Sequence, residues 1–251
     1  VLKYLNASFF SVMGNWDGEL GWNETSTNLT RPVRMVYLPN PDDTTYGEGG
    51  SRYENYYALN WSDALFVVLD VMTYTTDLNT SVGGGFGSNN WTLGQDQLNW
   101  FNTTMRNSGK KWKFIFIHHT VGGNASDQPN TNYGRGGGRA ARAGEQSSVH
   151  QIMIENGADA FFYGHDHVFV DMIVDKIHYT GIGKAGYPLS FFVQGGYSDD
   201  PNVLANFTGF GYATVYVEPN QVNVSWYNRS QDSLIYSFII DGQPPDVSLS
   251  H

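Results

Sequence analysis

The stretches KFIFIHH (residues 113–119) and AFFYGHDH (residues 160–167) share one pattern, in which a short apolar run ends in clustered histidines. Short apolar runs bounded by polar residues are typical of strands that are buried on both faces of a sheet. In α/β proteins, ligands bind beyond the carboxyl ends of such strands. The two stretches therefore predict core strands of an α/β fold, with a ligand site where the histidines lie.

Further strands and helices are predicted on both sides of these stretches. Helical spacing of apolar residues predicts helices over 92–108, with Thr92 as the N-cap, and over 149–156. Residues 18–51 are rich in Asn, Thr, Pro and Gly, which predicts a surface excursion, and residues 122–148 are predicted to form a loop. Strands are predicted over residues 8–13, 53–59, 64–70, 171–174, 176–181, 191–194, 212–218, 221–227 and 234–240.

The composition excludes several classes of protein. The chain has 251 residues, of which 40% are hydrophobic, so it can bury a sizeable core. Its 14 basic and 24 acidic residues give a net charge of -10, which repels nucleic acids and anionic membranes. No apolar stretch approaches the roughly 20 residues of a membrane-spanning helix. We therefore predict one domain over residues 1–251, with no nucleic-acid-binding surface and no membrane span.

The chain has no cysteine and many acceptor sequences for N-linked glycans. Without cysteine there is no disulfide and no thiolate ligand, so a bound metal would use His, Asp, Asn or Glu. Chance would produce about three acceptor sequences in a chain of this composition. The excess predicts a secreted or cell-surface glycoprotein that carries N-linked glycans, with acceptor sites at Asn6, Asn23, Asn28, Asn60, Asn79, Asn90, Asn102, Asn124, Asn206, Asn223 and Asn228.

The clustered histidines predict a metal site. If the second strand continues through its histidines, His165 and His167 lie on one face and Asp166 on the other. The same alternation allows only one of His118 and His119 to face the site. Imidazoles that converge at strand ends are common ligands of borderline metal ions. The alternative is that these histidines lie in solvated surface loops and bind nothing. We favour the metal site because two separate pairs of histidines each follow a core strand.

Three motifs in order resemble a known family. GNWD (residues 14–17), FIHH (116–119) and GHDH (164–167) resemble the last three of the five motifs of calcineurin-like metallophosphoesterases, the superfamily that includes purple acid phosphatases. QLNW (97–100) resembles the family's helix before its histidine-bearing strand, and residues 211–240 resemble its final meander. The resemblance therefore spans nearly the whole chain.

The resemblance implies a fold and a reaction. The fold is α/β, with two mixed β-sheets in a sandwich flanked by helices. The reaction is direct hydrolysis of a phosphoric ester at a centre of two divalent or trivalent metal ions, such as Fe, Zn or Mn.

The resemblance also assigns roles to individual residues. Asn15 would bind the second metal and help to orient the substrate phosphate. His118 and His165 would complete the protein ligands of that metal, and His167 would bind the first metal. His119 would face the substrate or support the neighbouring ligands. A purely structural role for His119, packing at the strand end, is a nearly equal alternative.

This chain departs from the family pattern in two places. Trp16 stands where the family has a histidine that contacts the phosphate or the leaving group, and an indole cannot transfer a proton near neutral pH. Asp17 is retained and is predicted to support the site. The first two motifs of the family occur nowhere in residues 1–251. We therefore expect the domain to be N-terminally incomplete, with its first strands and several metal ligands supplied by a segment upstream of Val1 or by another chain.

The sequence favours an extracellular phosphatase or phosphodiesterase but leaves alternatives open. One is a catalytically impaired, glycosylated cell-surface or matrix structural protein on the same scaffold. A weaker one is a carbohydrate-binding module. Arg135, Arg139 and Arg142 follow His118 in a predicted loop, where they would either reach a phosphate or simply be solvated.

Overall fold

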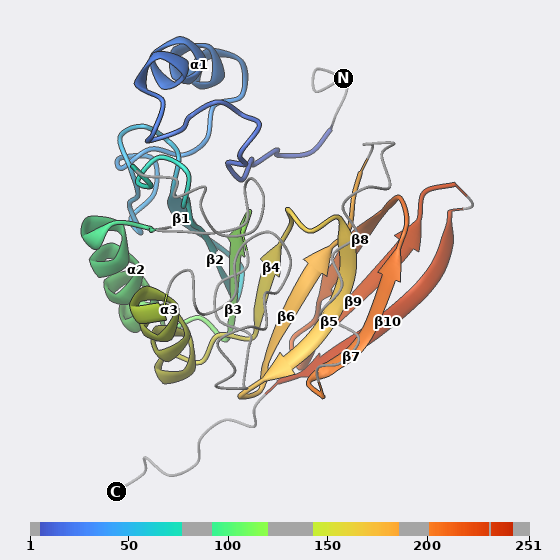
Figure 1. The fold of residues 1–251 in the computed structure, drawn as a ribbon. Helices are drawn as coiled ribbons and strands as arrows, with labels where there is room; N and C mark the ends of the chain where they lie inside the picture. Colours follow the sequence, from blue (N-terminus) through green and yellow to red (C-terminus); the bar gives the residue numbers. More distant parts are fainter. Residues whose placement is uncertain (1–5, 77–91, 120–142, 186–200, 231, 243–251) are drawn as a thin grey trace, which may run out of the picture.

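The computed structural model of the chain describes residues 6–76, 92–119, 143–185, 201–230 and 232–242. Two β-sheets pack face to face, and two helices cover the outer face of the larger sheet (Figure 1). In chain order the elements are α1 (Glu24–Tyr37), β1 (Tyr57–Trp61), β2 (Ala64–Val68), α2 (Gln95–Asn107), β3 (Trp112–Ile117), α3 (Ala143–Glu155), β4 (Ala160–Tyr163), β5 (Val168–Val174), β6 (Ile177–Ile182), β7 (Val203–Thr208), β8 (Gly211–Val217), β9 (Gln221–Asn228) and β10 (Ser233–Asp241).

The larger sheet has seven strands in the order β1-β2-β3-β4-β6-β5-β7. Strands β2, β3, β4 and β6 are parallel to one another, whereas β1, β5 and β7 pair with their neighbours in antiparallel fashion. All four residues of β4 are buried, as its apolar sequence predicted. Because β3 and β4 are parallel neighbours, their carboxyl ends meet at one edge of the sheet.

Helices α2 and α3 cover one face of this sheet and close the main core. Phe101 of α2 and Val149 of α3 are fully buried in the same apolar cluster as the outer-face residues of the strands. The prediction that Thr92 caps α2 was wrong: the helix begins after Gly94, and the Thr92 hydroxyl accepts the Gly94 N–H at 2.9 Å. Helix α3 begins at Ala143, before its apolar periodicity starts.

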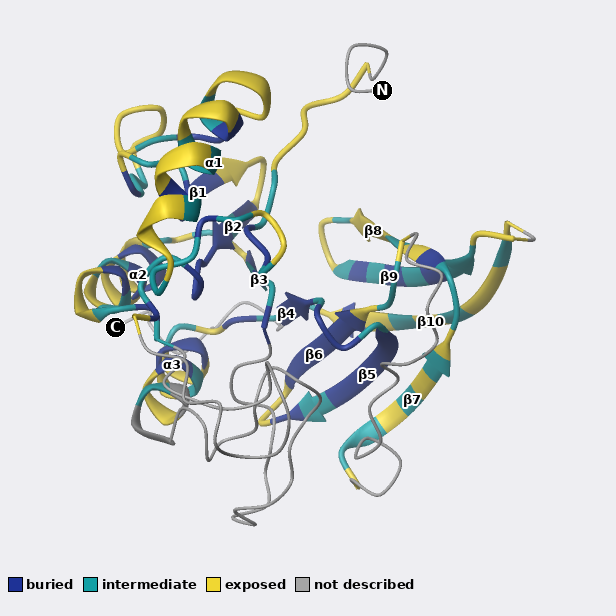
Figure 2. Ribbon diagram, turned by 45° about the horizontal axis from the view of Figure 1, so that its top comes forward, coloured by how far each residue is buried: buried dark blue, intermediate teal, exposed yellow. Residues whose placement is uncertain are grey.

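The smaller sheet, in the order β10-β9-β8, covers part of the other face. Val222 and Val224 of β9 and Ile240 of β10 pack against Trp112 and Phe114 of β3. This sheet is antiparallel throughout, not mixed as expected, because its strands follow one another through short turns. Figure 2 shows that the buried residues concentrate in the central strands of the larger sheet.

Two strand predictions need correction. Residues 8–13 form no strand, because side chains take the place of a neighbouring strand: Ser11 N donates to Asn40 Oδ1 at 2.9 Å and Tyr57 Oη donates to Ser11 O at 2.9 Å. Strand β7, an edge strand with half-exposed residues, was not predicted. The strand predicted over 191–194 lies outside the described residues.

Helix α1 lies within the segment predicted as a surface excursion. Its polar side faces the protein, where buried Glu19 pairs with Arg31 and Arg34. Its apolar residues Leu29 and Val36 are 69% and 72% exposed. The apolar residues of α1 therefore do not lie on the face that packs against the protein. This explains why the sequence pattern did not predict the helix.

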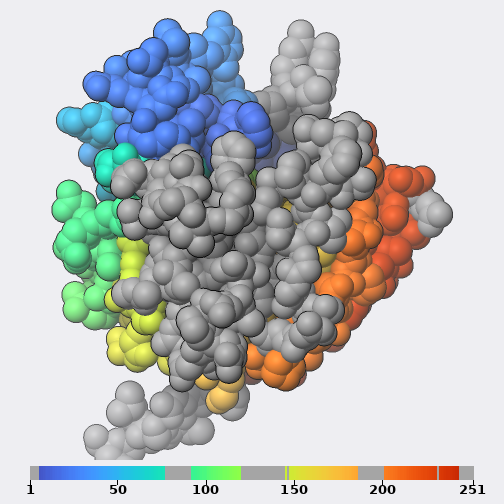
Figure 3. Space-filling model, in the orientation of Figure 1, coloured from blue at the N-terminus to red at the C-terminus, as the bar shows by residue number. Residues whose placement is uncertain are grey.

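Helix α1 and the C-terminal strands lie at opposite ends of the molecule (Figure 3). Among the residues that the structure describes, no helix has the length and apolarity needed to cross a membrane.

Candidate metal centre

Three predicted site residues from distant parts of the sequence meet at the carboxyl ends of β3 and β4. His118 Nε2 lies 2.9 Å from Asn15 Oδ1. His165 Nδ1 lies 3.2 Å from the same oxygen and 3.1 Å from His118 Nε2. One amide oxygen and two imidazole nitrogens thus form a triangle of nearly equal sides.

Hydrogen bonds alone cannot satisfy this triangle. The amide oxygen only accepts, and each of the two nitrogens carries at most one hydrogen. If both nitrogens are protonated, no lone pair is left for the contact between them. If only one is protonated, the other nitrogen turns its lone pair towards the oxygen. A cation that all three lone pairs face removes this conflict, so the donor set fits a metal ion.

His119 also belongs to this cluster, although strand alternation allowed only one residue of the pair. Strand β3 ends at Ile117, so alternation does not extend to the histidines. His119 is fully buried, and its ring stacks on that of His165 with a centroid separation of 3.7 Å. One ligand atom from each of His118, His119 and His165 lies within 4.8 Å of the others. The sequence pattern did not show that β3 ends before the histidines, and this is why it excluded one of the two from the cluster.

His167 is placed differently. Strand β4 ends at Tyr163, and His165 and His167 both have left-handed backbone conformations, with φ of 67° and 60°. The rule that put these two histidines on one strand face therefore does not apply. His167 is half-buried and is not a member of the histidine cluster. Its assignment to a first metal stays a prediction.

The glycines of two motifs give the His118 ring its place. A Cβ atom on Gly14 would lie 3.1 Å from Cε1 of that ring, closer than side chains normally approach. A Cβ atom on Gly164 would lie 3.5 Å from its Nδ1, an ordinary van der Waals contact, so the steric need for glycine is at Gly14. The Gly164 N–H also donates to His118 O at 3.1 Å and ties the two strand ends together. Glycine thus allows the backbone to approach the imidazole closely.

Asp17 and Trp16 differ in their surroundings. Asp17 Oδ2 accepts the Gly14 N–H at 2.7 Å, and Asp17 N donates to Gly14 O at 3.1 Å. These two bonds close the loop that carries Asn15. Trp16 projects from the same loop and is 83% exposed.

Asp70 stabilises a neighbouring loop at the same edge of the sheet. It is fully buried, and its carboxylate accepts hydrogen bonds from Asn55 Nδ2 at 2.6 Å and Met72 N at 2.7 Å. Burial raises the pKa of Asp70, and these donors oppose part of that rise. These hydrogen bonds give Asp70 a structural role at this edge of the sheet.

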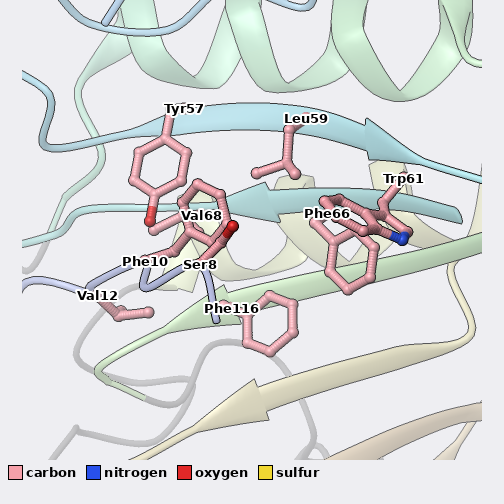
Figure 4. A pocket seen from close by; sticks show the side chains of 9 residues that line it. All are labelled: Ser8, Phe10, Val12, Tyr57, Leu59, Trp61, Phe66, Val68 and Phe116. Carbon is pink, nitrogen blue, oxygen red and sulfur yellow. The ribbon is translucent and has the colours of Figure 1, made fainter. Parts of the chain in front are cut away.

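An apolar groove of about 390 Å³ lies on the inner face of the larger sheet, beside the region that the smaller sheet covers (Figure 4). Its aromatic lining comes from the N-terminal segment and from β1, β2 and β3, and includes Phe10, Tyr57, Trp61, Phe66 and Phe116. Phe116 precedes the site residue His118 on β3. One wall of the groove therefore lies two residues from the histidine cluster along the chain.

The chain resembles known proteins in sequence and in structure. The calcineurin-like phosphoesterase family matches residues 1–169. No match is found among curated proteins. Solved structures with the same fold include GAP50, the anchor in the inner membrane complex of Plasmodium, at 12% identity and a TM-score of 0.58. They also include the purple acid phosphatase PPD1 from yellow lupin seeds, at 13% identity and a TM-score of 0.59, and PhoD, at 10% and 0.56.

These likenesses differ in how much of each protein they span. The alignments cover 94%, 92% and 86% of this chain, but only 66%, 38% and 49% of GAP50, PPD1 and PhoD. At these identities they establish the fold alone. The family match covers more than half of the 251 residues and includes the asparagine and both histidine motifs. The chain belongs to the calcineurin-like phosphoesterase family.

Proposed function

We propose that this protein hydrolyses phosphoric esters with the help of metal ions. The triangle of Asn15 Oδ1, His118 Nε2 and His165 Nδ1 carries the proposal, because it offers three converging lone pairs at one edge of the sheet. Family membership supplies the reaction class. Two ions of Fe, Zn or Mn would polarise the phosphoryl oxygen and lower the pKa of a bound water.

The site residues of this chain would have different roles in metal and substrate binding. Asn15, His118 and His165 would hold one ion, and Asn15 would also orient the phosphate. Asp17 keeps the Asn15 loop closed. His119 is buried, which opposes a direct contact with substrate and favours a role inside the centre.

We further propose that residues outside 1–251 complete the centre. The carboxylates of the first two family motifs do not occur in this chain, and the solved structures that it matches are longer. The open apolar groove beside the site is a suitable place for added chain, because a strand with apolar side chains would bury Phe66 and Phe116 there.

The surroundings of the acceptor asparagines support an extracellular glycoprotein. Six of them are exposed, namely Asn6, Asn23, Asn28, Asn60, Asn102 and Asn206, and two are partly exposed, namely Asn223 and Asn228. Asn79, Asn90 and Asn124 lie outside the described residues. The loop arginines Arg135, Arg139 and Arg142 also lie outside them. None of the eight described asparagines is buried, so each leaves room for a glycan. Mass spectrometry before and after enzymatic deglycosylation of the native protein tests this, and unmodified asparagines at all sites would refute it.

Trp16 favours a second candidate, a structural protein that has lost catalysis. A largely exposed indole at this position cannot replace the proton transfer of a histidine, which typically contributes about 10²- to 10⁴-fold to a rate. This candidate predicts metal binding without turnover. Activity measurements with an ester that needs no protonation of its leaving group separate the two.

The decisive assay uses p-nitrophenyl phosphate and bis(p-nitrophenyl) phosphate with added Zn²⁺, Mn²⁺ or Fe²⁺. We expect hydrolysis that a chelator abolishes and that Asn15→Ala and His165→Ala each reduce at least about 100-fold. Asn107→Ala, at the exposed end of α2, is the matched control and should leave the rate unchanged. Equal activity in all variants would show that a different site or a contaminant is responsible. Metal binding without hydrolysis of either ester would favour the structural protein.

A further inference from the structure

We propose that His119 is a metal ligand, so that His118, His119 and His165, together with Asn15, hold one Zn²⁺-type ion. The family resemblance assigns no ligand role to His119 and gives the second metal only Asn15, His118 and His165. The proposal rests on the proposed metal centre and changes which residues build it.

The distances within the cluster suit a single ion. Bonds of about 2.0–2.1 Å from nitrogen or oxygen to zinc place neighbouring tetrahedral ligands about 3.3 Å apart. The three sides of the Asn15, His118 and His165 triangle are 2.9, 3.1 and 3.2 Å. The ligand atom of His119 lies within 4.8 Å of those of the two other histidines. A side-chain shift on the order of one ångström would bring it to ligand distance.

The surroundings of His119 hold its ring against the site. Its ring plane lies 29° from that of His165 at 3.7 Å between centroids, and it meets His118 edge-on at 5.1 Å. His119 and His165 are 0% and 3% exposed. Because an imidazole nitrogen binds a metal in the plane of its ring, ligation by His119 requires this ring to turn out of the stack towards the other two histidines.

The donor set also indicates the class of ion. Three imidazoles and one amide oxygen favour Zn²⁺ or Co²⁺ over Mg²⁺ or Ca²⁺, which prefer shells made of oxygen. Three histidine ligands with a further position for oxygen is a pattern known from catalytic zinc sites.

The test is a titration of the metal-free protein with Co²⁺ and Zn²⁺, read by the visible absorption of bound Co²⁺ and by calorimetry. His119→Phe keeps an aromatic ring for the stack but removes both nitrogens. We expect it to weaken binding at least about tenfold and to change the Co²⁺ spectrum. Asn107→Ala, at the exposed end of α2, should leave the affinity of this ion within about twofold and its spectrum unchanged.

Two controls make the outcome unambiguous. His119→Gln, which offers an amide oxygen, should recover part of the affinity with a spectrum that differs from that of the unmodified protein. Circular dichroism and urea unfolding identify a variant that has lost its fold, and affinities are compared among folded variants. A wild-type spectrum and affinity in His119→Phe would overturn the proposal. Because the titration needs no turnover, that result would leave phosphoester hydrolysis intact, whereas loss of hydrolysis alone would leave the ligand assignment intact.

Discussion

Two phenylalanines on β3 show how differently the two halves of one sheet face are covered. Phe114 and Phe116 point to the same face because they are two residues apart on a strand. Phe114 is 1% exposed and packs with Val222 and Val224 of the smaller sheet. Phe116 is only half-buried and lines the open groove. The boundary of the smaller sheet therefore falls between these two side chains.

The difference teaches that the inner face of the larger sheet is left partly open near the end of β3 that leads to His118. At the edge of the smaller sheet, Val215 and Val217 of β8 are 38% and 39% exposed, although they are the register partners of buried Val224 and Val222. The edge strand β8 and the groove thus each present apolar surface. Elsewhere on the same face, both sheets contribute to a closed core.

The largest expected effect comes from Phe114→Ala beneath the smaller sheet. Removing a fully buried phenylalanine should lower the free energy of unfolding by about 3–5 kcal/mol. Phe116→Ala should cost only about 1–2 kcal/mol, because solvent already reaches its ring. Urea unfolding of both variants, followed by tryptophan fluorescence, measures the difference.

Equal losses in the two phenylalanine variants would contradict the comparison. Such a result would mean that the groove is covered in solution, by another part of the protein or by a second copy.

A smaller effect is expected from Asp159, which precedes β4 at the opposite end of the strand from the site. Its carboxylate accepts the Lys113 N–H at 2.7 Å, yet burial raises its pKa to about 6. Between about pH 4 and 6 the folded protein therefore holds a proton that the unfolded chain has lost. Stability from this group should fall by at most about 3 kcal/mol as the pH rises through this range.

Asp159→Asn tests this dependence, since an amide does not titrate and its oxygen still accepts the Lys113 N–H. The unfolding free energy of the variant should change less between pH 4 and 6 than that of the unmodified protein. Asp63→Asn, in the exposed turn between β1 and β2, is the control and should keep the original profile. Identical profiles for Asp159→Asn and the unmodified protein would show that another group titrates.

The smallest effect on stability is expected at the groove rim. Trp61, at the end of β1, is 65% exposed, so Trp61→Ser should change the free energy of unfolding by no more than about 0.5 kcal/mol. Binding of a fluorescent apolar dye to the groove should weaken, because one of its aromatic walls is removed. A large loss of stability would instead mean that Trp61 is buried against something in solution.

Local patterns sufficed to predict much of the core. The apolar runs that became β2, β3 and β4, and the alternating segments that became β8, β9 and β10, were predicted within a few residues. Their burial follows from composition over short windows, which sequence displays directly. Helix α1 was missed because long-range ion pairs to Glu19, not an apolar face, attach it to the protein.

The sequence by itself determined the chemistry of the candidate site: an asparagine and clustered histidines after core strands, in the order of a phosphoesterase. Only the tertiary structure decided which of these groups meet. Strand β3 ends before His118 and β4 ends before His165, so loop conformations, and not strand alternation, direct the imidazoles. The parallel pairing of β3 with β4, together with the loop at Gly14, then brings Asn15 within 3.2 Å of both rings. Such convergence depends on contacts between residues that are more than a hundred positions apart, and no local pattern encodes it.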